Sequence, residues 1–255
     1  ILTRRDILFH DRSERVEKCM TPRERLITAP PTISPEEARR IFMQFKVEKL
    51  PLVDSGGRLA GLITSSDLVK RAMYPDATRD SRGRLTVAAA IGVKDESIRR
   101  AEALIEAQVD VLVIDVAHGH TESVIHMLRR LRSNYGDEVE IIAGNVATAE
   151  GTEDLISAGA SAVKVGVGPG SVCTTRIVAG VGVPQLTAIM MCAEISEKMG
   201  VPIIADGGVR NSADLVKALA AGASTVMIGR LLAGTDESPG SIVVRNGRKM
   251  KIYRG

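Results

Sequence analysis

The feature that most constrains the fold is a regular alternation of short apolar runs with longer helical segments, which begins at residue 85. The apolar runs predict strands over residues 85–92, 109–116, 140–144, 162–167, 201–205 and 225–228. The segments between them predict helices over residues 97–107, 120–134, 149–158, 186–199 and 212–221. This alternation is typical of an α/β fold with a parallel sheet and crossover helices.

Candidate functional residues lie at or just beyond the carboxyl ends of these predicted strands: Asp115, Asn145, Cys173, Asp206 and Gly229. In a (β/α)8 barrel, catalytic groups gather at this end. An open doubly wound sheet also places a crevice there, but no G-x-G-x-x-G follows the first predicted strand. We therefore predict a TIM barrel, with six of the eight β/α units visible.

The composition argues against several functions. A net charge of +3 gives no support for nucleic acid or anionic membrane as the main partner, and 2% aromatic residues with no Trp disfavour base stacking. The three cysteines form no C-x-x-C pair, which indicates a reducing compartment and neither a disulfide scaffold nor a thiolate zinc site. No apolar stretch approaches the roughly 20 residues of a membrane span. These observations predict a cytoplasmic protein.

A glycine-rich loop containing a cysteine follows the fourth predicted strand, in Lys164-Val-Gly-Val-Gly-Pro-Gly-Ser-Val-Cys-Thr-Thr-Arg176. Its three glycines allow the backbone to approach a ligand closely. Cys173, flanked by hydroxyls and followed by Arg176, is a candidate nucleophile. A glycine-rich turn with an incidental cysteine explains the loop alone equally well.

Two neighbouring strand ends carry further candidates. Asp115 either caps the following turn or accepts hydrogen bonds from ribose hydroxyls. Asn145 offers an amide beside a glycine, or is a plain turn residue. His118 and His120 are two apart without a nearby third ligand in the sequence, so we predict no metal site there.

The last two strand ends read Asp206-Gly-Gly-Val-Arg210 and Met227-Ile-Gly-Arg230. Glycine amides at the seventh and eighth positions of a barrel typically hold phosphate. Asp206, directly before the glycines, is placed to bind a ribose next to that phosphate. A purely structural aspartate is the alternative, and the combination of acid and glycines favours the ligand.

A smaller module precedes the alternating region. It predicts a helix over residues 34–45, strands over 49–53 and 58–64 with a turn between them, and a helix from 65. The pair Thr64/Asp67 repeats an earlier pair, Thr3/Asp6. Each aspartate either caps a helix, its commoner use, or joins the threonine at a ribose.

The motif Gly61-Leu-Ile-Thr-x-x-Asp67 resembles a CBS domain pair with a complete second repeat and only the tail of the first. The resemblance assigns residues 1–83 to a CBS module and residues 84–255 to the barrel. CBS pairs commonly bind adenine nucleotides. The implied contacts are Thr64, Asp67, Thr3 and Asp6.

Four motifs in the second region resemble the IMP dehydrogenase/GMP reductase family. They are Gly166-Val-Gly-Pro-Gly-Ser-Val-Cys-Thr-Thr175, Gly180-Val-Gly-Val-Pro-Gln185, Ala205-Asp-Gly-Gly208 and Leu232-Ala-Gly-Thr-Asp-Glu-Ser-Pro-Gly240. The resemblance covers almost the whole chain. It implies oxidation of IMP to XMP with NAD⁺, assisted by K⁺, in a homotetramer when the protein is full length.

The resemblance also implies a role for each matching residue. Cys173 attacks C2 of the purine to form a covalent thioimidate, and Thr175 lies near the water that hydrolyses it. The implied IMP contacts are Ser171, Asp206, Gly207, Gly208, Gly229, Arg230, Tyr253 and Gly255. The implied NAD contacts are Asp115, Asn145, Gly166 and Gly168. The implied K⁺ ligands are the carbonyl oxygens of Gly168, Gly170 and Cys173.

Two alternatives to the dehydrogenase stay open. GMP reductase shares the barrel and the loop cysteine but deaminates GMP with NADPH. A nucleotide-sensing module with a vestigial barrel is the non-enzymatic alternative, and the presence of Cys173, Thr175, Asp206 and the glycines counts against it. Arg230 departs from the family, which usually has serine there.

We expect the 255 residues to be a fragment of a longer enzyme, without the first barrel strands and the first CBS repeat, and without the C-terminal flap that activates the water. The purified chain alone is therefore expected to show no turnover. An assay for XMP formation from IMP and NAD⁺ checks this, and measurable XMP would contradict it.

Overall fold

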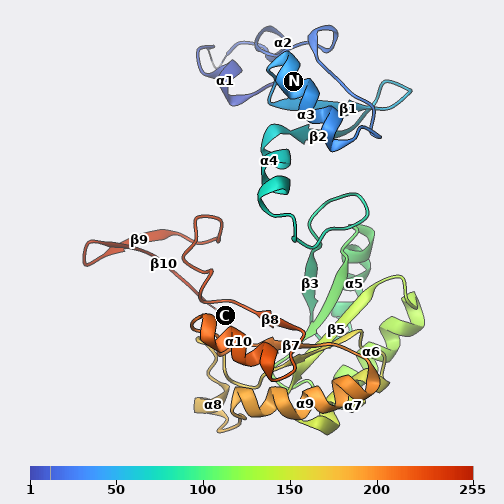
Figure 1. Cartoon of the computed structure of the whole chain (residues 1–255), viewed down its shortest axis with the longest axis vertical. Helices are drawn as coiled ribbons and strands as arrows, with labels where there is room; N and C mark the ends of the chain where they lie inside the picture. The colour runs from blue at the N-terminus through green and yellow to red at the C-terminus, as the bar shows by residue number, and fades with distance from the viewer. Residues whose placement is uncertain (12, 255) are drawn as a thin grey trace. The chain divides into compact units, whose positions relative to one another are not determined.

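A computed structural model describes residues 1–11 and 13–254 and divides the chain into two compact units (Figure 1). Unit 1 is Ile1–Thr78, and unit 2 begins at Arg79. The division lies between residues 78 and 79, whereas the sequence analysis places it between 83 and 84. Among the described residues, none of the helices has the length and apolar character needed to cross a bilayer.

Unit 1 is a small α/β module built on an antiparallel hairpin of β1 (Lys49–Val53) and β2 (Leu59–Thr64). Ser34 caps α3 (Pro35–Phe45): its hydroxyl oxygen accepts from the backbone N–H of Glu37, and its own O–H and backbone N–H donate to the Glu37 carboxylate. The remaining elements are α1 (Arg4–Ile7), α2 (Val16–Cys19), the 3-10 helix η1 (Arg23–Arg25) and α4 (Ser65–Met73). Among its described residues, the buried hydrophobic cluster is small and consists of Ala29, Ala38, Phe42 and Leu50.

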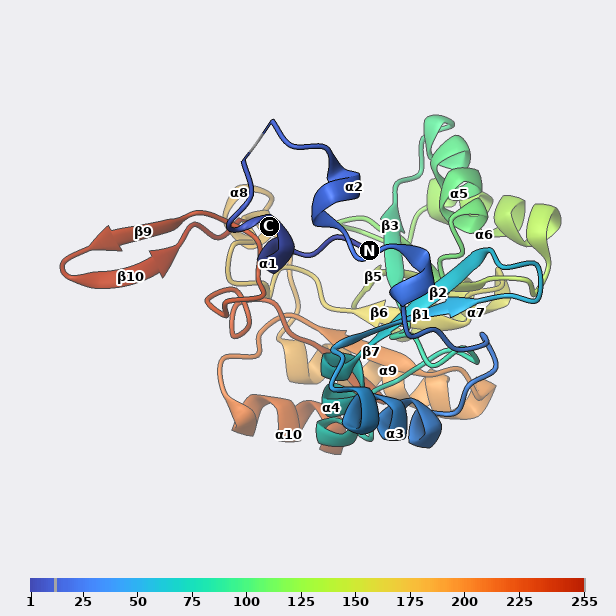
Figure 2. The ribbon, with the colours of Figure 1, turned by 90° about the horizontal axis from the view of Figure 1, so that it is seen from above.

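Unit 2 contains a six-stranded, all-parallel sheet in the order β3-β4-β5-β6-β7-β8. The strands are β3 (Ala88–Ile91), β4 (Val111–Asp115), β5 (Glu140–Val146), β6 (Ala162–Val165), β7 (Ile203–Asp206) and β8 (Thr225–Met227). The connecting helices are α5 (Glu96–Glu106), α6 (Glu122–Tyr135), α7 (Ala149–Ser157), α9 (Gln185–Met199) and α10 (Ser212–Ala220). The sheet is curved, and these helices lie along its outer face (Figures 1 and 2).

The predicted α/β alternation with a parallel sheet is therefore confirmed, with shifts at element ends. The first strand begins at Ala88 and not at residue 85, because Leu85 pairs with Arg79 in an isolated antiparallel bridge. Conversely, β5 continues to Val146, beyond the predicted end at 144. Within the described residues, β3 and β8 are the two edges of the sheet.

Side-chain alternation sends one set of strand residues to the helices and the other to the opposite, inner face. Leu112 and Ile114 of β4 join the core beneath the helices, so Asp115 turns to the inner face. A register shift between Gly144 and Val146 interrupts β5. This irregularity turns Asn145 to the inner face and returns Val146 to the core.

The C-terminal part of unit 2 contains a hairpin that the sequence analysis did not predict. Strands β9 (Ile242–Arg245) and β10 (Arg248–Lys251) pair antiparallel and project away from the sheet (Figures 1 and 2). Their turn is Asn246-Gly247, and both residues have positive φ, 52° and 73°. Asn-Gly is a strong signal for such a turn, so the sequence contained the information.

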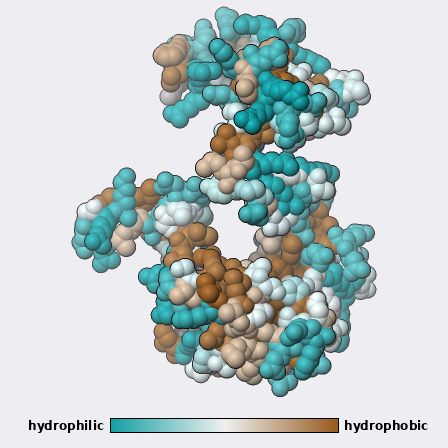
Figure 3. All heavy atoms as spheres, in the orientation of Figure 1, coloured by the Kyte–Doolittle hydropathy of each residue, from teal (hydrophilic) through white to brown (hydrophobic). Residues whose placement is uncertain are grey.

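Hydrophobic side chains also lie on the surface of unit 2. In the space-filling view, brown atoms gather over α10 and β8 (Figure 3). These elements expose Val216, Leu219 and Met227.

The packing predicts a large difference between two Leu→Ala substitutions on helices of unit 2. Leu128 on α6 is fully buried, so Leu128→Ala is expected to lower the free energy of unfolding by roughly 2–5 kcal/mol through lost contacts and a residual cavity. Leu219 on α10 is 42% exposed, so Leu219→Ala serves as the matched control with a much smaller loss. Urea unfolding followed by circular dichroism measures both. Equal losses would contradict this description of the core.

Candidate active site

The loop after β6 contains glycines at positions where a larger side chain would force neighbouring atoms to move. Gly166 has φ of +145°, and a Cβ there would lie 2.2 Å from the carbonyl oxygen of Asp206. Gly168 has φ of +82°, and a Cβ there would lie 2.5 Å from Cγ of Arg176. The loop therefore packs directly against the end of β7 and against the Arg176 side chain.

Cys173 is exposed on this loop, and its thiol contacts the threonine two residues on. The Sγ of Cys173 lies 3.3 Å from Oγ1 of Thr175. Hydrogen bonding from the Thr175 side chain and backbone, helped by the Arg176 charge, lowers the pKa of the Cys173 thiol. A larger thiolate fraction at neutral pH makes this cysteine a better nucleophile.

A layer of hydrogen-bonded polar side chains crosses the inner face of the sheet next to the loop. Lys164 of β6 donates to Oδ1 of Asp115 at 2.9 Å and to Oδ2 of Asp206 at 2.6 Å. Asn145 donates to the same Oδ2 of Asp206 at 3.0 Å and to the Gly166 carbonyl at 2.7 Å. Four consecutive strands thus each contribute one member of the layer.

Two cavities open at this edge of the sheet and share part of their lining. One, of about 560 Å³, is lined by Cys173 and Thr175 together with Asp115, Asn145 and Asp206. The other, of about 440 Å³, lies over the ends of β7 and β8. The lining residues common to both are Pro169, Gly170, Ser171, Asp206, Gly207, Met227 and Tyr253. Both volumes suit a small ligand.

The second cavity combines glycine backbone with positive charge. Gly207 and Gly208 have φ of +90° and +83°, and a Cβ on Gly207 would lie 2.9 Å from Cγ of Pro169. A Cβ on Gly229 would lie 2.9 Å from the hydroxyl of Tyr253. The arginines in its lining are Arg176, Arg210 and Arg230. This combination suits an anionic group such as a phosphate.

The three arginines differ in how firmly they are held. Arg176 donates to the Val183 carbonyl at 2.7 Å, and Arg210 lies 3.6 Å from Asp214. Within residues 1–11 and 13–254, the Arg230 guanidinium has no hydrogen-bond or ion-pair partner. It is therefore free to meet a ligand.

The structure brings most of the sequence-predicted barrel residues together around these cavities. They are Asp115, Asn145, Gly166, Gly168, Gly170, Ser171, Cys173, Thr175, Asp206, Gly207, Gly208, Gly229, Arg230 and Tyr253. Gly255 lies outside the described residues. The Gly170 carbonyl, a predicted K⁺ ligand, already accepts from the Cys173 N–H at 3.1 Å, which leaves it one further lone pair.

Sequence reasoning missed two residues of the site. The sequence analysis assigns no role to Lys164, although a lysine inside the apolar run 162–167 is itself a sign of a buried ion pair. Gln185 donates to the carbonyls of Val165 and Asp206 at 2.9 and 3.2 Å, tying α9 to two strand ends. No local sequence signal predicts the Gln185 contacts, because they depend on the tertiary fold.

In unit 1 the two Thr/Asp pairs cap helices. Thr3 Oγ1 donates to Asp6 at 2.6 Å, and Thr64 Oγ1 donates to Asp67 at 2.7 Å, each at a helix N-terminus. Thr3 also lines a cavity of about 450 Å³, whose cationic residues are Arg4, Arg5, Arg25, Lys46 and Lys49. The predicted adenine-nucleotide contacts therefore also serve as capping residues.

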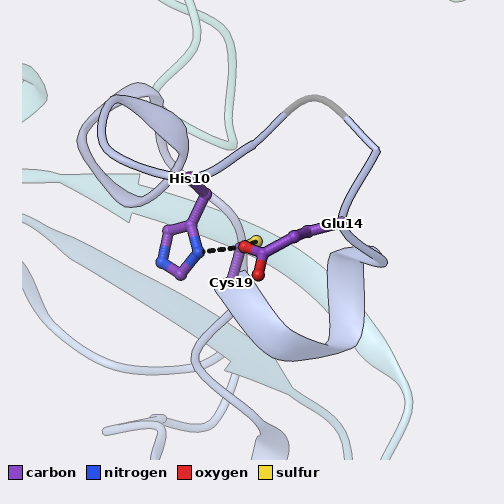
Figure 4. A group of neighbouring side chains, drawn as sticks. All are labelled: His10, Glu14 and Cys19. Atoms are coloured by element: carbon purple, nitrogen blue, oxygen red, sulfur yellow. Dashed lines mark hydrogen bonds and ion pairs between the residues drawn. The ribbon is translucent and has the colours of Figure 1, made fainter.

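Among the described residues, one group of three potential metal ligands lies within 4.8 Å, formed by His10, Glu14 and Cys19 (Figure 4). His10 Nδ1 lies 2.5 Å from Glu14 Oε2, so these two side chains are hydrogen-bonded to each other. Partial burial, and then the Glu14 charge, raise the pKa of the Cys19 thiol. A neutral thiol is a poor metal ligand, and we assign no metal here.

The two histidines for which the sequence analysis predicted no metal site lie in unit 2. The rings of His118 and His120 pack edge to face, with 6.5 Å between the ring centroids. His120 has a carboxylate neighbour that is distant in the sequence, since its Nε2 lies 2.7 Å from Asp154 Oδ2. This pair joins the segment before α6 to α7.

Comparison with protein families shows which family the chain belongs to. Residues 13–255 match the model of the "IMP dehydrogenase / GMP reductase domain". The chain belongs to the IMP dehydrogenase/GMP reductase family. The predicted family resemblance is thereby confirmed.

Curated relatives within the family are named inosine-5′-monophosphate dehydrogenase. The protein from Aquifex aeolicus is 58% identical over 258 residues, and that from Nitrosopumilus maritimus is 51% identical over 255 residues. Both matches include 100% of this chain but 52% and 53% of the relatives. The chain thus spans about half the length of the curated relatives it matches.

Solved structures of similar fold are named GMP reductase, the other enzyme in the family name. GMP reductase from Trypanosoma brucei, a cysteine-to-alanine variant in complex with guanosine 5′-monophosphate, is 48% identical with a TM-score of 0.86, covering 100% of this chain and 53% of that one. The same reductase in complex with guanosine 5′-triphosphate is 49% identical with a TM-score of 0.82, covering 93% and 56%. Because these matches include unit 1, its presence does not distinguish a dehydrogenase from a reductase.

The lowered pKa of Cys173 predicts a measurable effect of its threonine neighbour. In Thr175→Ala the side-chain hydrogen bond is lost, so the pKa of Cys173 rises toward its ordinary value and the thiolate fraction falls. Alkylation by iodoacetamide between about pH 7 and 8 is expected to slow, with its profile displaced to higher pH. Peptide mass spectrometry distinguishes Cys173 from Cys19 and Cys192. Thr174→Ala is the matched control, and an unchanged profile in Thr175→Ala would contradict this account.

Proposed function

We propose that Cys173 is the nucleophile of a purine-nucleotide oxidoreductase, and that the reaction is oxidation of IMP to XMP. The observation that supports this most is the arrangement of a thiol of lowered pKa and a threonine hydroxyl in one cavity with two carboxylates. A cavity of glycine amides and arginines adjoins it. The chain lies within a family whose curated relatives are named as IMP dehydrogenases.

The substrate is held from both ends. The phosphate binds to the backbone of Gly207, Gly208 and Gly229, with Arg230 adding charge. Oδ2 of Asp206 accepts hydrogen bonds from Lys164 and Asn145. Its Oδ1 accepts from none of the described residues and is available to the ribose hydroxyls. With ribose and phosphate fixed in this way, the purine extends toward Cys173.

The chemistry follows from the thiol. The Cys173 thiolate adds to the electron-poor C2 of the purine, and C2 then loses its hydrogen as hydride, which leaves a thioimidate. Water adds to the same carbon, and the thiolate departs as XMP forms. The Thr175 hydroxyl, 3.3 Å from the sulfur, is placed to hold that water and to donate to the departing thiolate.

The residues present fit NAD, which would supply the hydride acceptor. Asp115 is half-exposed, and its Oδ2 accepts from none of the described residues, so it offers an acceptor to the nicotinamide end. Asn145 and the backbone at Gly166 and Gly168 line the same cavity. Carbonyl oxygens of Gly168, Gly170 and Cys173 are ligands of the type that K⁺ takes, and the free lone pair on Gly170 fits that role.

The larger architecture is also part of the proposal. The two open edges at β3 and β8 fit a sheet that closes into a full (β/α)8 barrel with further strands. Unit 1 is proposed to be a CBS module whose cationic cavity receives the phosphates of an adenine nucleotide. A homotetramer and a cytoplasmic location complete the family-based proposal.

Reduction of GMP is the second candidate, favoured by the structural similarity to the reductase from T. brucei. It uses the same thiol attack at C2, with ammonia as the leaving group and NADPH as the hydride donor. The adduct on Cys173 is the same in both reactions. The two activities therefore differ in what leaves C2 and in the direction of hydride transfer.

An absorbance assay separates the two activities. The full-length protein that carries this chain is incubated with IMP and NAD⁺, and separately with GMP and NADPH. We expect absorbance at about 340 nm to rise in the first mixture and to stay constant in the second. A fall in the second mixture alone would assign the reductase, and no change in either would contradict both.

The same assay tests the nucleophile. Cys173→Ser replaces the thiol with a hydroxyl that is barely ionised at neutral pH, so the rate is expected to fall by roughly a thousandfold or more. Cys192→Ser on α9 is the matched control for loss of a thiol outside the cavity. Unchanged activity in Cys173→Ser would rule out the covalent mechanism.

A further inference from the structure

Lys164 is an unusual residue for a central strand. All four residues of β6 are buried, and the Lys164 side chain is 3% exposed. A charged amine in such a position is stable only when it is paired and hydrogen-bonded. Its two partners come from two other strands: Asp206 lies on the adjacent β7, and Asp115 lies on β4, on the far side of β5.

The backbone of β5 is built to allow both contacts. Gly144 pairs with Asp115 on one side and with Lys164 on the other, so it lies between them in the sheet. A Cβ on Gly144 would lie 2.7 Å from Cβ of Lys164. Because no side chain intervenes, the ammonium can cross β5 and reach Asp115.

The contacts of the ammonium determine which oxygen of each carboxylate remains available to accept a hydrogen bond from a ligand. It occupies Oδ1 of Asp115 and, with Asn145, Oδ2 of Asp206. Each carboxylate therefore keeps one oxygen for the cavity that contains Cys173. The two remaining oxygens belong to carboxylates that are held by one buried cation.

We propose that Lys164 is a positioning residue that orients both acceptors, one for the nucleotide ribose and one for the cofactor. The proposal rests on the proposed function for the identity of the nucleotide. Lys164 is part of the lining of the cavity that contains Cys173, and it acts there by fixing the Asp206 carboxylate in the rotamer that presents Oδ1 to the ribose hydroxyls. The recognition of those hydroxyls therefore depends on Lys164.

The test compares the affinities of IMP and 2′,3′-dideoxy-IMP for the full-length protein that carries this chain. Isothermal titration calorimetry gives the ratio of the two Kd values, which measures recognition of the ribose hydroxyls alone. In the unaltered protein we expect IMP to bind about tenfold or more tightly than the dideoxy nucleotide, because hydroxyls donate to a charged acceptor.

In Lys164→Met the Asp206 carboxylate loses its fixed orientation, and the ratio is expected to fall to about one to three. Lys164→Gln, which keeps a hydrogen-bond donor without the charge, is expected to give an intermediate ratio. It also serves as the measurable variant if Lys164→Met does not fold. Lys198→Met, an exposed lysine on α9, is the matched control with an unchanged ratio.

A purely structural lysine would lower the unfolding temperature of the variants and leave the ratio in the folded protein at its original value. That result in Lys164→Met or, failing it, in Lys164→Gln would overturn the proposal. Failure of the proposed function is a different outcome: a protein that is not a purine-nucleotide oxidoreductase would bind neither nucleotide, and a GMP reductase, whose product is IMP, would be identified by the absorbance assay.

Discussion

The candidate active site depends on one buried charge, the ammonium of Lys164. Lys164 lies in a strand with no exposed residue, so its ammonium must be neutralised within the fold. Asp206 does this from the adjacent strand β7 and Asp115 from β4, one strand further away, and removing one partner of a buried pair typically costs roughly 3–5 kcal/mol. The same contacts place two carboxylates beside Cys173. Folding of the sheet and assembly of the site are therefore one event, because the sheet cannot form in this register without bringing these groups together.

The parallel sheet explains why much of the site could be predicted. Since the carboxyl ends of parallel strands meet at one edge, residues as distant in the sequence as Asp115 and Asp206 had to converge once the strands were recognised. The glycine-rich loop could be placed for the same reason, and Gly166 and Gly207 do adopt backbone conformations that favour glycine. The sequence alone did not distinguish a nucleophile from a turn at Cys173, and only the converging neighbours favoured the nucleophile.

Other features depend on tertiary contacts that no local pattern encodes. Simple alternation in β5 would point Asn145 into the core, and only the register shift beside it turns the amide to the site. Gln185 acts through backbone carbonyls of two other strand ends. In unit 1, each Thr/Asp pair fits both a cap and a ribose site, and the structure shows that the cap is formed. The hairpin at Asn246-Gly247 does not depend on tertiary contacts in this way, because the Asn-Gly turn signal is visible in the sequence.

The covalent step at Cys173 is the central claim, and mass spectrometry tests it most directly. The full-length protein that carries this chain is mixed with IMP and NAD⁺, quenched in acid and digested. The account predicts that the peptide containing Cys173 gains the mass of IMP less two hydrogens, and that this gain requires both reactants. A protein that binds IMP and transfers hydride without this adduct, or that carries the adduct on Cys19 or Cys192, would contradict the account.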